Sequence, residues 1–85
     1  MSIKVLVVDD HPVVAAGLRH LIDAQPDLEV AGSAEDGREA VRQVESLRPD
    51  VVVMDISMPE LNGIEATALI LKRAPQVKVV VLSMY

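Results

Sequence analysis

The stretch that decides the fold is Ile3-Lys4-Val5-Leu6-Val7-Val8-Asp9-Asp10-His11-Pro12. Its first six residues are apolar apart from Lys4, so they predict a strand over residues 3–8. Two acidic residues follow directly, and Pro12 predicts the start of a helix, because the first residue of a helix needs no N–H donor. This order predicts the first half of a strand–helix–strand unit.

Three more strands are predicted further along the chain. Residues 28–33 alternate weakly between apolar and polar types and predict a less buried strand. Residues 51–54 and 77–82 are nearly continuous apolar runs, which are typical of strands covered on both faces. Helical segments with short links separate the four runs, so right-handed crossovers and a parallel sheet are expected.

Three helices are predicted over residues 12–25, 36–48 and 62–74, each ended by the proline that follows. The second opens with a capping box and the third with Asn62 as its cap. In each helix, apolar side chains are expected to share one face. They are Val14, Leu18, Leu21 and Ile22 in the first, Ala40, Val41, Val44 and Leu47 in the second, and Ile64, Thr67, Ala68 and Leu71 in the third. Some of Leu69, Ile70 and Leu71 must then face outward, either as ordinary exposed residues or as a partner-binding patch.

Composition excludes several classes of function. The chain has 85 residues and a mass of 9.2 kDa, which suits one small domain. The absence of cysteine excludes disulfides and cysteine-based zinc sites, and a net charge of −5 has the wrong sign for gripping nucleic-acid phosphates. No apolar run approaches the ~18 residues of a membrane span, and the first residues lack the pattern of a signal peptide. A small, acidic, cytoplasmic α/β domain is expected.

Three carboxylates are expected to meet at one edge of the sheet. Asp9 and Asp10 follow the first strand, and Asp55 follows the third. Because parallel strands end at the same edge and neighbours lie ~4.8 Å apart, these side chains would converge on one crevice. Three carboxylates this close cannot all stay charged without a cation, and hard oxygen ligands favour Mg²⁺. The alternative is that the acid pair only solvates a loop and complements the dipole of the first helix.

Two segments carry a resemblance to a known family. They are Val5-Leu6-Val7-Val8-Asp9-Asp10-His11-Pro12 and Val53-Met54-Asp55-Ile56-Ser57-Met58-Pro59-Glu60-Leu61-Asn62-Gly63. Together they resemble the receiver domain of two-component response regulators, in the LuxR/NarL-type subfamily of transcriptional regulators. The resemblance covers residues 1–85 and implies a flavodoxin-like (CheY-like) parallel sheet of order 2-1-3-4 with three helices.

The resemblance also implies a role for individual residues. Asp55 would be the phosphoacceptor, receiving a phosphoryl group from a sensor histidine kinase or a small acyl phosphate. Mg²⁺ would be held by Asp9, Asp10, Asp55 and the backbone carbonyl of Ser57. The domain would be a phosphorylation-dependent switch that controls a transcriptional output domain, and not an enzyme.

Other residues near these motifs have smaller implied roles. Ser83 matches the switch residue that hydrogen-bonds the phosphoryl group, while Pro59 and Gly63 set the geometry of the loop after the acceptor. His11 is expected to serve at the helix entry or on the surface rather than as a ligand, and His20 is expected to be exposed.

The family's domain continues beyond the fourth strand into a fourth helix, a fifth strand that carries a lysine, and a fifth helix, and none of these is in the sequence. We therefore expect a truncated receiver domain without its DNA-binding output domain, whose fourth strand is a bare edge. Such a chain would form a homodimer or swapped oligomer and bind no nucleic acid directly. The candidate interface is Leu69, Leu71, Val79 and Val81. Because the lysine is absent, a non-catalytic dimerisation or partner-binding module stays open as the alternative function.

Overall fold

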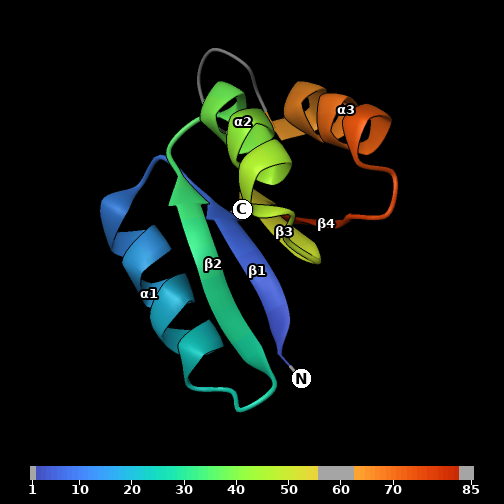
Figure 1. Ribbon diagram of the computed structural model, residues 1–85. Helices are drawn as coiled ribbons and strands as arrows, with labels where there is room; N and C mark the ends of the chain where they lie inside the picture. The colour runs from blue at the N-terminus through green and yellow to red at the C-terminus, as the bar shows by residue number, and fades with distance from the viewer. Residues whose placement is uncertain (1, 56–62, 83–85) are drawn as a thin grey trace.

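Strands and helices alternate along the chain in the computed structural model, which describes residues 2–55 and 63–82 (Figure 1). The strands are β1 (Ile3–Val8), β2 (Leu28–Ala34), β3 (Val51–Asp55) and β4 (Lys78–Leu82). The helices are α1 (Pro12–Asp23), α2 (Gly37–Leu47) and α3 (Gly63–Arg73). The predicted order of strands and helices is confirmed, and the apolar runs and prolines located the elements to within a turn.

The sheet is parallel and has the strand order β2-β1-β3-β4, as predicted. The chain moves outward from β1 to β2, then crosses back over β1 to reach β3 and continues to β4. The direction of winding therefore reverses between β1 and β3, and such a reversal is where open α/β sheets bind ligands. Val8 of β1 pairs with Met54 of β3, so the two strands end level with each other.

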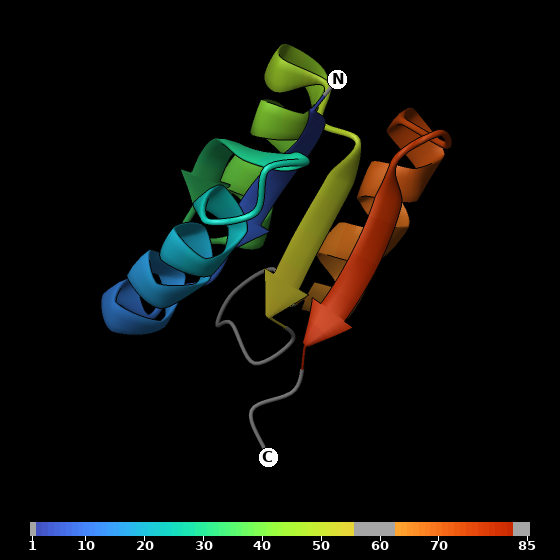
Figure 2. The same ribbon diagram turned by 90° about the horizontal axis from the view of Figure 1, so that it is seen from below.

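The helices cover the two faces of the sheet unequally. Helix α1 lies on one face, over β1 and β2, whereas α2 and α3 lie on the other (Figure 2). Alternate strand residues follow this division, because successive side chains of a strand point to opposite faces. Leu6, Val8, Val52 and Met54 pack with α2 and α3, while Val5 and Val7 pack with α1.

The inward face predicted for α3 is wrong. Ala66, Ile70 and Ala74, spaced four residues apart, are buried against α2 and the sheet, whereas Ile64 is 68% exposed and Leu71 is 42% exposed. The two alanines allow the helix to approach its neighbours closely, and Ile70 fills the space between them. Leu69 is also exposed, so the prediction that this helix leaves leucines outward is confirmed.

The other two helices differ from prediction at single positions. Leu21 of α1 is 63% exposed, because this helix packs through Ala15, Leu18 and Ile22 instead. Leu47 is exposed at the end of α2, past its last buried turn. The start of α2 is as predicted, since the Asp36 carboxylate accepts a hydrogen bond of 2.8 Å from the backbone N–H of Glu39.

Candidate metal centre

Asp9 and Asp55 reach the same place from two neighbouring strands. Asp55 is the last residue of β3, and Asp9 directly follows β1. The backbone N–H of Asp9 donates a 3.0 Å hydrogen bond to the carbonyl of Ala34, which holds it in line with the end of β2. Both carboxylates are buried, with 4% of Asp9 and 2% of Asp55 exposed. Two buried acidic side chains therefore lie side by side at the C-terminal ends of β1 and β3.

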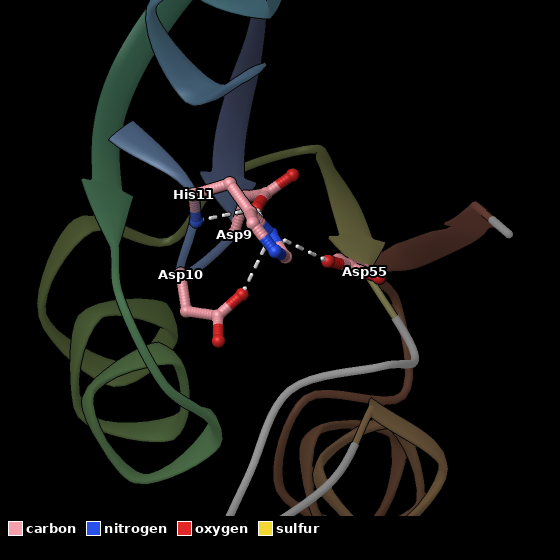
Figure 3. Close-up of polar contacts among 4 residues, drawn as sticks. All are labelled: Asp9, Asp10, His11 and Asp55. Atoms are coloured by element: carbon pink, nitrogen blue, oxygen red, sulfur yellow. Dashed lines mark hydrogen bonds and ion pairs between the residues drawn. The ribbon is translucent and has the colours of Figure 1, made fainter. Parts of the chain in front are cut away.

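Asp10 completes a group of three carboxylates from the other side of the crevice (Figure 3). Its side chain is 27% exposed, yet its Oδ1 atom is buried and accepts no hydrogen bond. Oxygen atoms of Asp9, Asp10 and Asp55, together with a nitrogen of His11, all lie within 4.8 Å of one another. The structure therefore brings together the three aspartates that the sequence placed at one edge of the sheet.

His11 also belongs to this group, although it was not predicted to be a ligand; its predicted place at the helix entry or on the surface is confirmed. It occupies the N-cap position of α1, but its side chain makes no capping bond. Its backbone N–H donates to Asp9 Oδ1 at 2.8 Å, and this short-range turn swings the ring back over the acid pair. The ring atom Nδ1 lies 3.0 Å from Asp9 Oδ1, 2.9 Å from Asp10 Oδ1 and 3.6 Å from Asp55 Oδ2 (Figure 3).

The carboxylates change the protonation of His11. The hydrogen bond to Asp9 and the negative charge of Asp10 raise the pKa of the imidazole above its ordinary value of 6.5, and these effects outweigh the desolvation that lowers it. A proton on Nδ1 can be donated to Asp9 Oδ1, which lies 3.0 Å away, while Asp10 Oδ1 lies 2.9 Å from the same nitrogen. The charge of a protonated His11 would offset part of the negative charge of the group.

The donor set suits a divalent cation. A buried carboxylate oxygen without a hydrogen bond and two further buried carboxylates form an anionic, oxygen-rich cup, which is the environment that Mg²⁺ prefers. A hollow of about 140 Å³ borders Asp9 and Asp10 on the β2 side.

The other predicted site residues are placed as follows. Ser57, Pro59 and Ser83 lie outside the described residues, and Gly63 is the first residue of α3. Among the predicted interface residues, Leu69, Leu71 and Val81 are exposed, by 36%, 42% and 45%. Val79 instead packs against the core formed with α2 and α3, because it lies on the covered face of β4. Val80, which was not predicted, is 48% exposed on the opposite face.

Comparison with known proteins shows the family of the chain. Residues 5–85 match the response regulator receiver domain, and the chain belongs to this family. Receiver domains are signalling domains that are phosphorylated by histidine kinases, and they bind Mg²⁺ at an acidic pocket such as the one described above.

Three relatives illustrate the similarity. A protein-glutamate methylesterase/protein-glutamine glutaminase of Thermotoga maritima is 56% identical over 73 residues, which make up 86% of this chain and 21% of the relative. The transcriptional regulatory protein DegU of Brevibacillus brevis is 43% identical over 84 residues, or 99% of this chain and 36% of DegU. The crystal structure of a LuxR-family response regulator from Aurantimonas sp. SI85-9A1 superimposes with a TM-score of 0.94 at 36% identity, covering all of this chain and 61% of that one.

The chain therefore spans about a fifth to a third of the length of these two curated relatives. None of the helices in the described part of the chain is long and apolar enough to cross a membrane.

Proposed function

We propose that the chain is a phosphorylation-dependent switch of a two-component system, in which Asp55 accepts a phosphoryl group from a sensor histidine kinase. One observation carries this proposal: Asp55 ends β3 as a buried carboxylate that faces the acid pair at the end of β1. In a longer regulator, residues 1–85 would belong to the receiver domain and control a transcriptional output domain in the cytoplasm.

The reaction at this site is a direct phosphoryl transfer. A carboxylate oxygen of Asp55 forms a new P–O bond as the P–N bond of the kinase phosphohistidine breaks, and the leaving imidazole keeps the electron pair and takes up a proton. A carboxylate is a weak nucleophile, so the chain contributes mainly by positioning it. The β-sheet holds Asp55 rigidly, and Asp9 and Asp10 stand beside it as ligands for the cation. When bound, Mg²⁺ neutralises the phosphoryl oxygens as charge develops on them.

Three residues outside the described part, together with Gly63 at the start of α3, complete the proposal. The backbone carbonyl of Ser57 would add an oxygen ligand, and the Ser83 hydroxyl would donate a hydrogen bond to the phosphoryl group on Asp55. Pro59 and Gly63 would shape the loop after the acceptor. In this scheme the chain is a substrate of the kinase and is not itself an enzyme.

The test is the intact mass of the chain after incubation with Mg²⁺ and a small acyl phosphate. We expect the wild-type chain to gain one phosphoryl group and the Asp55→Asn variant to gain none. Asp27→Asn is the matched control, because it makes the same chemical change at an exposed position outside the cluster. A folded wild-type chain that stays at its original mass would refute the proposal.

A second proposal is self-association through β4, and it is favoured by the exposed apolar residues of this strand. In the described part of the sheet, β4 pairs with β3 and leaves its other side without a strand. Val80 and Val81, on opposite faces of this strand, are each nearly half exposed, and unpaired strands of this kind tend to pair with another chain. A homodimer or swapped oligomer would cover them, and this module could bind partners without being phosphorylated.

Sedimentation tests this association. We expect wild type to be dimeric or larger and Val80→Lys to be monomeric, because a charged residue on an edge strand opposes pairing. Leu21→Lys places the same charge on an exposed apolar position of α1 and should leave the association intact. A folded, monomeric wild type would refute this proposal and leave the phosphoacceptor proposal unaffected.

A further inference from the structure

The proposed phosphoacceptor site uses carboxylate oxygens, and it gives no role to the nitrogen in their midst. His11 Nδ1 is within 3.6 Å of an oxygen of each of Asp9, Asp10 and Asp55. Figure 3 shows the ring directed toward all three side chains from the start of α1. The backbone hydrogen bond from His11 to Asp9 fixes this approach, because it ties the main chain of His11 to the same carboxylate.

The spacing of these four atoms is that of ligands around one metal ion. Bonds of about 2.1 Å place neighbouring ligand atoms about 3.0 Å apart in an octahedral site and about 3.4 Å apart in a tetrahedral one. The three distances from Nδ1 are 2.9, 3.0 and 3.6 Å, and the whole set fits within 4.8 Å. A metal ion at the centre of the group would thus find the imidazole already at ligand distance from its oxygen ligands.

The nitrogen changes which ions this set favours. Mg²⁺ takes oxygen ligands almost exclusively, whereas imidazole nitrogen is a preferred ligand of zinc and of the neighbouring divalent transition metals. We propose that His11, through Nδ1, joins Asp9, Asp10 and Asp55 in binding a divalent transition-metal ion of the zinc class, which competes with Mg²⁺ at the same site. This inference rests on the proposed function in one respect, namely that the carboxylate group is the cation site of the receiver domain.

The competition would depend on His11. Binding of the transition metal through Nδ1 adds a ligand that Mg²⁺ does not use, so His11 strengthens the binding of the one ion without affecting that of the other. The half-exposed ring of His11 lies at the mouth of the site and needs no movement of the sheet to bind or release the ion. His11 would therefore set the concentration at which zinc-class ions displace Mg²⁺ from this site.

The experiment measures metal binding by the metal-free chain of 85 residues, with Co²⁺ as the probe, because its visible absorption reports the ligands of the ion. The variants are His11→Ala and His11→Gln, and the matched control is His20→Ala, which removes an exposed histidine outside the cluster. Circular dichroism checks that each chain is folded. Two different substitutions are made at His11 so that the test can still be carried out if one variant does not fold. Binding of Zn²⁺ and of Mg²⁺ is measured in parallel by calorimetry.

We expect both His11 variants to bind Co²⁺ and Zn²⁺ at least ~10-fold more weakly than wild type and to shift the visible Co²⁺ spectrum. Loss of a residue that only hydrogen-bonds a metal ligand weakens binding by about this factor, and loss of the ligand itself should cost at least as much. Mg²⁺ affinity should be retained, and His20→Ala should behave as wild type. Unchanged Co²⁺ affinity and spectrum in the His11 variants would overturn the inference.

The two proposals fail separately in this design. If Mg²⁺ supports phosphorylation of Asp55 but His11 does not affect Co²⁺ binding, only the present inference is overturned. If Co²⁺ binding depends on His11 but no phosphoryl group is ever added to Asp55, the inference stands and the phosphoacceptor function is refuted.

Discussion

Replacing Asp55 with asparagine should make the metal-free protein more stable, because it removes one of two buried negative charges that face each other. The ligand oxygens of Asp9 and Asp55 lie within 4.8 Å, and both residues are nearly inaccessible to solvent. At that separation and an effective dielectric constant of about 20, two unit charges repel by about 3.5 kcal/mol. The amide of asparagine keeps the shape of the side chain without this charge.

The net gain will be smaller than the gross repulsion. Protonated His11 attracts the same carboxylates, and some repulsion is relieved in the wild-type protein for that reason. We expect a net stabilisation of about 1–2 kcal/mol, which corresponds to a rise of about 4–16 °C in Tm for a domain of this size. The gain should be largest well above the ordinary histidine pKa of about 6.5, where His11 loses its charge.

The assay is urea denaturation of wild type and Asp55→Asn in a chelator, repeated with increasing Mg²⁺. Mg²⁺ stabilises a folded protein according to its affinity for the native state, by about 2.7 kcal/mol at one hundred times its Kd. Wild type should gain more than the variant, so the difference between the two should narrow or reverse as Mg²⁺ is added. Asp27→Asn, at an exposed position, should match wild type in both conditions.

Two results would refute this reasoning. If Asp55→Asn is no more stable than wild type in the chelator at high pH, the charge of Asp55 is not a cost to the native state. If Mg²⁺ stabilises both chains equally, Asp55 is not among the groups that hold the cation.

The remaining predictions concern packing and protonation. Ile70→Ala should lower the unfolding free energy by about 2–5 kcal/mol, because Ile70 is fully buried. Ile64→Ala changes a mostly exposed side chain and should alter this free energy by less than about 0.5 kcal/mol. Equal effects of the two substitutions in urea denaturation would contradict the orientation of α3. Gly32→Ala should cost about 1–3 kcal/mol in the same assay, since a Cβ there would lie 2.7 Å from a leucine methyl group of α2, and an unchanged midpoint would show that this side chain moves aside freely. In metal-free protein, NMR titration should give His11 a pKa above 6.5; its stabilising effect is then complete below that pH and is lost as the pH rises through the folded-state pKa, and a lowered pKa would contradict the contacts with the carboxylates.

The sequence predicted the fold well because its signals are local and redundant. Apolar runs specify the strands, prolines and capping residues bound the helices, and short links leave a parallel sheet as the solution. The meeting of Asp9 with Asp55 followed from the same rule, since residues after parallel strands share an edge. This part of the site required no knowledge of side-chain packing.

The failures have a different origin. The face of α3 was misplaced because helical periodicity treats all apolar residues alike, whereas packing against two neighbours favoured the small Ala66 and Ala74 over the larger Ile64. The place of His11 at the helix entry and on the surface is confirmed, but its contacts with the carboxylates were not predicted, because they depend on its backbone hydrogen bond to Asp9. Its place directly between an acid pair and a helix-opening proline was the available signal.

The pairing of Val8 with Met54 ties cation binding to the way the chain folds. Since side chains alternate along a strand, sliding β3 by one residue against β1 would turn Asp55 to the opposite face of the sheet. Those two strands are separated in the chain by a complete strand and two helices, and such non-local parallel pairing forms slowly. We therefore expect the ability to hold a cation to arise late during folding, once the two central strands have found their native register.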